Sequence, residues 1–451
     1  MSESTDRLQN HLAEAHRLLS SGEAEGLIGW VEGLHGSDLA DVVEHLEDEE
    51  DRLRLLELLP AGVASEALAE MEEEERPAEL LAAMEPDRIA ELVEELADDD
   101  AADLIGELDP AEQKRVLDVV DDPEEIRELL EYDEESAGGI MTRELVSVRL
   151  DATAGEAIEQ LRGLTDERKD FYTIFVVDAE ERLQGVVTLQ DLVFAAASRP
   201  MADMTEDPAA VVPVDMDQEE VGRLLSRYNL ASIGVVDVEG RLVGQITFDD
   251  VIDVVEAETT EDILRFASVS DEEQLRGTTL GAIRSRLPWL AVNFVTISMA
   301  AAVVWIYRET IEQAAVLAVI MPVIAGLGGN AGTQALAVTI RRIAISDETM
   351  SERWSVVRKE LIVGVINGFV LGLLVAVAST LLPGSPPVLG LVVMIAMWGN
   401  LIVASTLGAF CPIVLERLGV DPAVASSVFV TTFTDLFGFL LLLGLATQLL
   451  L

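Results

Sequence analysis

The sequence is poor in the residues that form disulfides and zinc sites. Its one cysteine, Cys411, excludes a disulfide framework and a thiolate metal cluster. The four histidines, His11, His16, His35 and His45, all precede residue 46, so zinc-type ligand sets are absent from the rest of the chain. No P-loop, nucleophile–base set or metal-hydrolase motif is present, so we do not expect an enzyme.

Positive charge is also scarce. Lysine occurs only at Lys114, Lys169 and Lys359, and 83 Asp and Glu residues give a formal net charge of -53. This balance is typical of a halophilic acidic protein, in which most carboxylates keep the surface hydrated in a salt-rich cytoplasm. We expect no nucleic-acid partner. The polar start of the chain, residues 1–20, indicates no signal peptide, so the acidic part should stay in the cytoplasm.

The charge is confined to one part of the chain. Residues 288–451 carry seven basic and nine acidic residues, which leaves a net charge of -51 on residues 1–287. Five apolar segments follow residue 284, a number that predicts a multi-pass domain in the plasma membrane with lipid around it. Arg and Lys at the short loops place the N-terminus inside and the C-terminus outside. The expected helices are 288–307, 314–340, 361–382, 388–415 and 423–451 within a domain of residues 284–451.

Asp435 is the only ionisable residue of the last apolar segment. A carboxylate in the middle of a spanning helix costs roughly 2.5–3.5 kcal/mol on insertion scales, so it normally faces a partner, a cavity or an ion. Helical spacing puts Ser427, Thr431 and Gly438 on the same face. This face favours a pore, and the alternative is a hydrogen bond from Asp435 to a neighbouring helix.

The second apolar segment contains a glycine-rich stretch with two amides. Gly328 and Gly329 precede Asn330, and Gln334 follows one helical turn later on the same face. Glycines at this density weaken a helix, so they indicate close backbone approach or exposed carbonyls that support a pore. Simple packing of small residues is the alternative interpretation.

Two different patterns divide the acidic part. Residues 1–131 show short amphipathic helices separated by prolines, which predict an α-helical superhelix. Residues 132–255 contain a duplication, because the block Val176–Leu192 recurs without a gap, 59 positions later, as Val235–Val251. Each copy reads strand, turn, strand and acidic helix start. The block resembles a tandem pair of CBS domains, which commonly bind adenine nucleotides such as ATP; an unrelated α/β repeat is the alternative.

An acidic helical pattern at residues 250–280 connects the repeat to the membrane part. Its carboxylates can crowd one side of the helix, where they repel one another, and a hard cation would remove the repulsion. A solvated acidic helix is the alternative. The carboxylates are Asp250, Asp253, Glu258, Glu261 and Asp262.

The order of these parts resembles the MgtE family of magnesium channels over essentially the whole chain. The motifs are Glu135–Thr142, the Gly-Gly-Asn stretch at 328–330, Lys359-Glu360-Leu361, and Asp421-Pro422-Ala423 followed by Thr434-Asp435. The resemblance implies three consecutive architectures, namely an α-helical superhelix, an α/β tandem CBS pair and an all-α bundle of five membrane helices. It also implies a homodimer whose Mg²⁺ pore contains Asp435, Thr431 and Ser427.

The family further implies that cytoplasmic Mg²⁺ closes the pore by bridging acidic surfaces. The corresponding positions here are Asp99, Asp103, Asp217, Glu219 and the five connector carboxylates. Asn229, Thr333, Ala337 and Val428 depart from the family pattern, which affects the number of regulatory sites and the ion selectivity.

Two other functions remain open from the sequence. One is a CBS-regulated secondary transporter for another divalent cation such as Co²⁺, against which the absence of an inverted repeat argues modestly. The other is a membrane-anchored nucleotide sensor.

Overall fold

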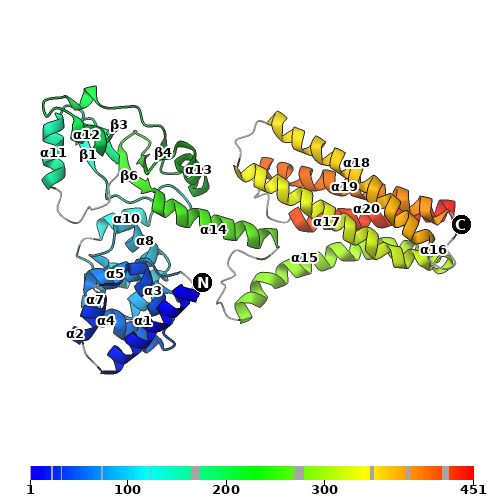
Figure 1. The fold of residues 1–451 in the computed structure, drawn as a ribbon, viewed down its shortest axis with the longest axis horizontal. Helices are drawn as coiled ribbons and strands as arrows, with labels where there is room; N and C mark the ends of the chain where they lie inside the picture. Colours follow the sequence, from blue (N-terminus) through cyan, green and yellow to red (C-terminus); the bar gives the residue numbers. More distant parts are fainter. Residues whose placement is uncertain are drawn as a thin grey trace. The chain divides into compact units, whose positions relative to one another are not determined.

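The computed structural model describes residues 2–21, 24–31, 33–72, 75–121, 123–163, 173–267, 269, 279–345, 350–381, 386, 388–418 and 426–450. The chain divides into two compact units, residues 1–257 and residues 258–451. Helix α14 (Phe248–Phe266) contains the boundary between them. Each unit is described by itself, and Figure 1 shows their elements.

Short helices form the beginning of the first unit. Proline sets several of their starts, because its missing N–H and fixed φ suit the first helical turn: Pro77, Pro86 and Pro110 each lie at the start of a helix. The helices are α1 (Ser2–Ser21), α2 (Ala24–Val31), α3 (Gly36–Glu44), α4 (Glu49–Leu58), α5 (Ala61–Ala69), α6 (Pro77–Ala83), α7 (Pro86–Val93), α8 (Asp98–Gly106), α9 (Pro110–Leu117) and α10 (Glu124–Leu129).

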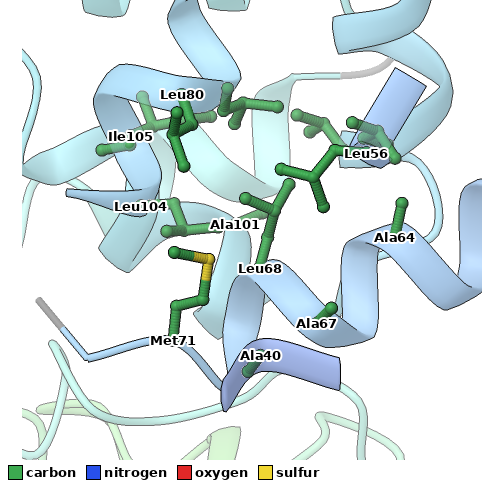
Figure 2. Packing of buried hydrophobic residues seen from close by; sticks show 14 of the residues in the cluster. Ala40, Leu56, Ala64, Ala67, Leu68, Met71, Leu80, Ala101, Leu104 and Ile105 are labelled. Carbon is green, nitrogen blue, oxygen red and sulfur yellow. The ribbon is translucent and has the colours of Figure 1, made fainter. Parts of the chain in front are cut away.

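These helices bury one continuous apolar core. Leu56, Leu68 and Ile105 are fully buried, and Figure 2 shows them with the smaller Ala64 and Ala67. Helices of six to ten residues are marginal alone in water, so α2 to α10 depend on this shared core for stability.

Two three-stranded sheets follow, one for each copy of the repeat. In each sheet the first strand pairs parallel with the second, and the second pairs antiparallel with the third. A register shift falls at Val176/Val177 in one sheet and at the equivalent Val235/Val236 in the other. The elements are β1 (Ser147–Arg149), α11 (Ala154–Gly163), β2 (Thr173–Val177), β3 (Leu183–Thr188), α12 (Leu189–Phe194), η2 (Met201–Asp203), β4 (Val211–Pro213), α13 (Gln218–Tyr228), β5 (Ser232–Val236) and β6 (Leu242–Thr247).

A Met-Thr pair precedes each copy, Met141-Thr142 before the first and Met204-Thr205 before the second, and each pair lies against the sheet of the other copy. Thr142, which precedes the first copy, bridges to Gln245 in the sheet of the second, and Glu206, which precedes the second copy, bridges to Val186 in the sheet of the first. Gly185 and Gly244 occupy equivalent positions of the duplicated block, where a Cβ atom would lie 2.3 Å from Thr205 Cγ2 and 2.6 Å from Met141 Sδ, respectively. The repeat therefore makes one paired α/β body rather than two separate domains.

Five helices of the second unit are long and apolar enough to span a membrane. The number agrees with the five predicted segments. They are α15 (Thr279–Ile306), α17 (Val316–Ile345), α18 (Met350–Thr380), α19 (Leu389–Arg417) and α20 (Ser426–Leu449), with the short α16 (Arg308–Gln313) between the first two. Helix α19 packs against α17, α18 and α20, and α15 contacts α20; Figure 1 shows α17 to α20 side by side, with α15 diverging from them toward its start.

Three details differ from the expected helices. Helix α18 begins at Met350, before the expected start at residue 361, because the charged stretch ahead of the apolar run continues the same helix. Helix α15 begins at Thr279 and contains Pro288 in its interior, whereas we expected the helix to start at that proline. A proline removes one hydrogen bond but need not end a helix, and Arg284 and Arg286 before it are good helix formers. Helix α14 ends at Phe266, and residues 270–278 of the expected connecting helix lie outside the described residues.

Candidate functional site

Asp435 lies on α20, partly buried within the helix bundle. Among the described residues, its carboxylate has neither an ion pair nor a hydrogen bond. The alternative in which Asp435 hydrogen-bonds a neighbouring helix therefore has no support in the described part of the chain. A spanning carboxylate without a partner in its own chain needs water, an ion or another subunit.

The polar face of α20 is narrower than the sequence predicted. Thr431 is exposed, one turn before Asp435. Gly438 instead turns into the bundle, where a Cβ atom would lie 2.9 Å from Asn400 Nδ2 on α19 and 2.9 Å from Ile324 Cγ2 on α17. Ser427 lies in α20, but its side chain lies outside the described residues.

The glycine-rich stretch of α17 has two faces. Gly328 packs inward, because a Cβ atom there would lie 2.3 Å from Asn400 Nδ2. Gly329 has no atom within 4 Å of the same position, and Asn330 and Gln334 are exposed. The packing interpretation therefore applies to Gly328, which lies close to α19. The pore interpretation applies to Asn330 and Gln334, which form a polar strip that no described residue of the chain covers.

A pocket of about 290 Å³ between α19 and α20 is not suited to an ion. Its lining is wholly apolar and includes Leu407, Phe410, Cys411, Phe429 and Phe433. A cation would lose its hydration there without gaining an oxygen ligand.

In the first unit, acidic residues gather where α8 meets the repeat and α14. Asp98 fixes the contact: its carboxylate accepts hydrogen bonds from Thr142 Oγ1 at 2.8 Å and from the backbone N–H of Arg143 at 3.2 Å. The next residue, Asp99, has its Oδ1 buried without a hydrogen-bond partner in the described residues. Asp250 on α14 accepts from Thr247 Oγ1 at 2.6 Å, which caps the start of the helix.

These carboxylates raise one another's pKa. Burial raises the pKa of Asp99 well above its usual range, and the negative charges of Asp100 and Asp250 raise it further. Burial raises the pKa of Asp100 to about 6, again with help from Asp250. The pKa of Asp253 is also raised, mainly by burial and to a smaller extent by the negative charge of Asp250. The cluster therefore favours protons or cations.

The other regulatory candidates have different surroundings. Asp217 caps α13 by accepting from the backbone N–H of Glu219 at 2.9 Å. Glu261 forms an ion pair with Arg265 one turn later in α14. Asp103 and Glu219 are exposed, Glu258 is partly buried, and the side chain of Asp262 lies outside the described residues.

No ready-made metal cage is present in the described ranges, where no three His, Cys, Asp or Glu side chains converge. A metal site with several carboxylate ligands would therefore need carboxylates from a second subunit, or a rearrangement that brings the acidic residues of this chain closer together.

The sequence did not lead us to three residues that the structure brings to these sites. Asp100 and Glu70 belong to the acidic cluster, since both charges act on its members. Asn400 is fully buried where α17, α19 and α20 meet. The run of three aspartates at the start of α8 and the isolated amide in the apolar run of α19 were the available signals.

Three family models match successive parts of the chain. A model described as the MgtE intracellular N domain matches residues 34–135, and the CBS domain matches residues 137–198 and 201–257. A model described as a divalent cation transporter, MgtE, matches residues 321–445. These matches confirm the expected architecture of helical domain, CBS pair and membrane helices.

Relatives of the chain agree with the models. The magnesium transporter MgtE of Enterococcus faecalis is 36% identical over 72% of this chain and 71% of its own length. The Thermus thermophilus protein of the same name is 38% identical over 72% of each chain.

The first unit also has counterparts of known structure. The cytosolic domain of an Mg²⁺ channel MgtE, solved in complex with ATP, is 37% identical over 54% of this chain and 99% of that chain, with a TM-score of 0.51. The soluble part of a magnesium transporter is 30% identical over 56% of this chain and 99% of that one, with a TM-score of 0.52.

Proposed function

The chain belongs to the MgtE family of magnesium transporters, and from this premise we propose that it is a homodimeric channel for the uptake of divalent cations, chiefly Mg²⁺. The observation that carries the proposal is Asp435, a carboxylate within a membrane helix that has no partner among the described residues of its own chain. Transport of an ion rather than chemistry on a substrate accounts for such a group, so the chain is not an enzyme.

A second subunit completes the ion site. One carboxylate cannot balance a divalent ion, whereas two related by a two-fold axis can. Mg²⁺ keeps several of its waters, so two Asp435 side chains, with hydroxyls of Thr431 and Ser427, hold it hydrated. The exposed Asn330 and Gln334 support a pore along the dimer axis, because polar side chains in a spanning helix avoid lipid. Gly328 and Gly329 give the backbone room beside them.

Cytoplasmic Mg²⁺ closes this channel. The ion bridges acidic residues of α8, the CBS pair and α14, so the closed state binds more ions than the open state and is favoured by mass action. The buried, unpartnered oxygen of Asp99 and its repulsion with Asp250 support a bridging site there. Asp103, Asp217, Glu219, Asp253, Glu258, Glu261 and Asp262 are the further candidates.

Membrane orientation and nucleotide binding complete the proposal. The acidic part lies in the cytoplasm and the C-terminus outside, since the short loops with Arg and Lys follow the positive-inside rule. ATP or another adenine nucleotide binds the CBS cleft, by analogy with the related cytosolic domain solved with ATP.

Flux measurements test the proposal. Purified protein in liposomes is expected to conduct Mg²⁺, and Asp435→Asn to abolish or strongly reduce the flux; Ca²⁺, Co²⁺ and Mn²⁺ give the selectivity. Single-channel currents separate a channel from a coupled transporter for an ion such as Co²⁺. Full flux in Asp435→Asn would remove Asp435 from the ion pathway, and the absence of flux in the wild type would leave the nucleotide sensor as the better function.

A further inference from the structure

One amide lies at the meeting point of three membrane helices. Asn400 on α19 is completely buried, and its Nδ2 donates a hydrogen bond to the backbone carbonyl of Ile324 on α17 at 3.2 Å. A carbonyl can only accept, so the orientation of the amide follows from this contact. Its Oδ1 is buried and has no hydrogen-bond partner in the part of the chain that the structure describes.

Two glycines make room for this side chain. A Cβ atom at Gly328 of α17 would lie 2.3 Å from Asn400 Nδ2, and one at Gly438 of α20 would lie 2.9 Å from the same nitrogen. Gly438 follows Asp435 by three residues, less than one helical turn along α20, and faces into the bundle. Thr434, beside Asp435, is fully buried and faces Gly328.

The buried amide of Asn400 lowers the stability of the helix bundle relative to an apolar side chain. A buried amide oxygen without a donor loses its hydration and gains nothing in exchange, so an apolar residue would fill a purely structural position better. An amide retained at the level of Asp435 therefore points to a part in ion passage.

We propose that Asn400 is a positioning residue for the ion site. Its hydrogen bond joins α19 to α17. Its contact with Gly438 fixes the position of α20 along and around the helix axis, and therefore the position of Asp435 on that helix. The inference rests on the proposed function, because it assumes that Asp435 receives the ion.

Asn400→Ala tests the proposal in liposomes, with Asn10→Ala, an exposed asparagine of α1 outside the membrane helices, as the control. We expect Mg²⁺ flux to fall by about tenfold or more and the ratio of Mg²⁺ to Ca²⁺ flux to change, because a small misplacement of a binding group lowers its effectiveness steeply. Asn10→Ala should behave as wild type. Wild-type flux in Asn400→Ala, or a loss of equal size for both ions with reduced yield of folded protein, overturns the proposal.

A compensating pair separates packing from misfolding. Gly328→Ala should clash with Asn400, and Asn400→Ala should remove the clash, so the double variant should unfold at a higher temperature in detergent than Gly328→Ala alone. A double variant no more stable than Gly328→Ala contradicts the direct contact.

Hydrogen exchange of the backbone amides tests the contacts of Asn400 without measuring transport. In the purified full chain without an ion gradient, the amides of residues 321–331 and 430–441 should exchange faster in Asn400→Ala than in wild type. Unchanged exchange overturns the proposed contact of Asn400 with α17 and α20. If exchange is faster in Asn400→Ala but the wild-type protein transports no Mg²⁺, the contact is correct and the proposed function is wrong.

Discussion

At the scale of single residues, the proposed Mg²⁺ bridge at the acidic cluster implies that protons and Mg²⁺ compete for the same carboxylates. The pKa of Asp100 is raised from an ordinary value of 3.8 to about 6 in the folded arrangement. A raised carboxylate pKa stabilises the folded contact at low pH, and this stabilisation is lost as pH rises through about 6. A proton and a magnesium ion should therefore replace one another at this contact.

When divalent ions are chelated, we expect the protection of the α8 amides from hydrogen exchange to fall as pH rises from about 4 to about 7, and to return when Mg²⁺ is added. A shift of about two pKa units corresponds to about 3 kcal/mol, and partial exposure of the group reduces this to about 1–2 kcal/mol. Hydrogen exchange of the full chain as a function of pH measures the effect. Asp100→Asn should flatten the pH dependence.

The exposed Asp87 on α7 provides the control for this prediction. Asp87→Asn should leave the pH dependence of α8 unchanged. If both variants behave as wild type, the carboxylate of Asp100 does not control the contact, and Asp99 or Asp250 must be responsible.

At the scale of helices, packing between α18 and α19 depends on glycines four residues apart. Cβ atoms at Gly364, Gly368 and Gly372 would lie 2.9–3.0 Å from atoms of α19, mostly of its backbone. Glycine at this spacing lets two spanning helices approach closely. Trp398 of α19 donates from Nε1 to the carbonyl of Val365 at 3.0 Å, which secures the pair.

Gly368→Ala should separate these helices. The new methyl group would lie 3.0 Å from the carbonyl oxygen of Trp398, which cannot rotate away, so we expect destabilisation by about 1–3 kcal/mol. Tryptophan fluorescence during denaturant unfolding in detergent measures the loss. Gly326→Ala, which meets no atom within 4 Å, should be neutral or slightly stabilising; equal losses in both variants would contradict the packing argument.

These glycines show which features of the membrane helices the sequence could predict and which it could not. The apolar runs predicted five helices, and prolines such as Pro77 and Pro86 predicted helix boundaries, because both effects are local. Whether Gly328 is buried and Gly329 open depends on which helix lies beside each, and periodicity alone carries no such information. For the same reason Asn400 was not recognised: its role arises from contacts with α17 and α20.

At the scale of the whole molecule, long-range contacts were the least predictable part of the site. The hydrogen bond between Asp98 and Thr142 joins residues 44 positions apart. The family resemblance pointed to Asp99 and Asp250, but the participation of Asp100 and Glu70 follows from the way α8 packs. The duplicated block, in contrast, predicted two of the three strands of each sheet, since each copy carries its own strand and turn residues, whereas β1 and β4 lie before the block.

The charge of the molecule leads to a last prediction. Residues 1–287 carry a net charge of -51, so their repulsion should destabilise this part at low ionic strength and be screened by salt. At about 1 M salt the screening length is only ~3 Å, so any further effect of Mg²⁺ at that ionic strength must come from direct or single-water contacts. In 1 M KCl, millimolar Mg²⁺ should therefore still raise the thermal stability of residues 1–257 within the wild-type full chain. Asp99→Asn with Asp250→Asn should remove this increment while keeping the response to KCl. An increment that persists in the double variant would show that Mg²⁺ acts elsewhere, and one that vanishes in 1 M KCl for the wild type would show that it acts only by screening.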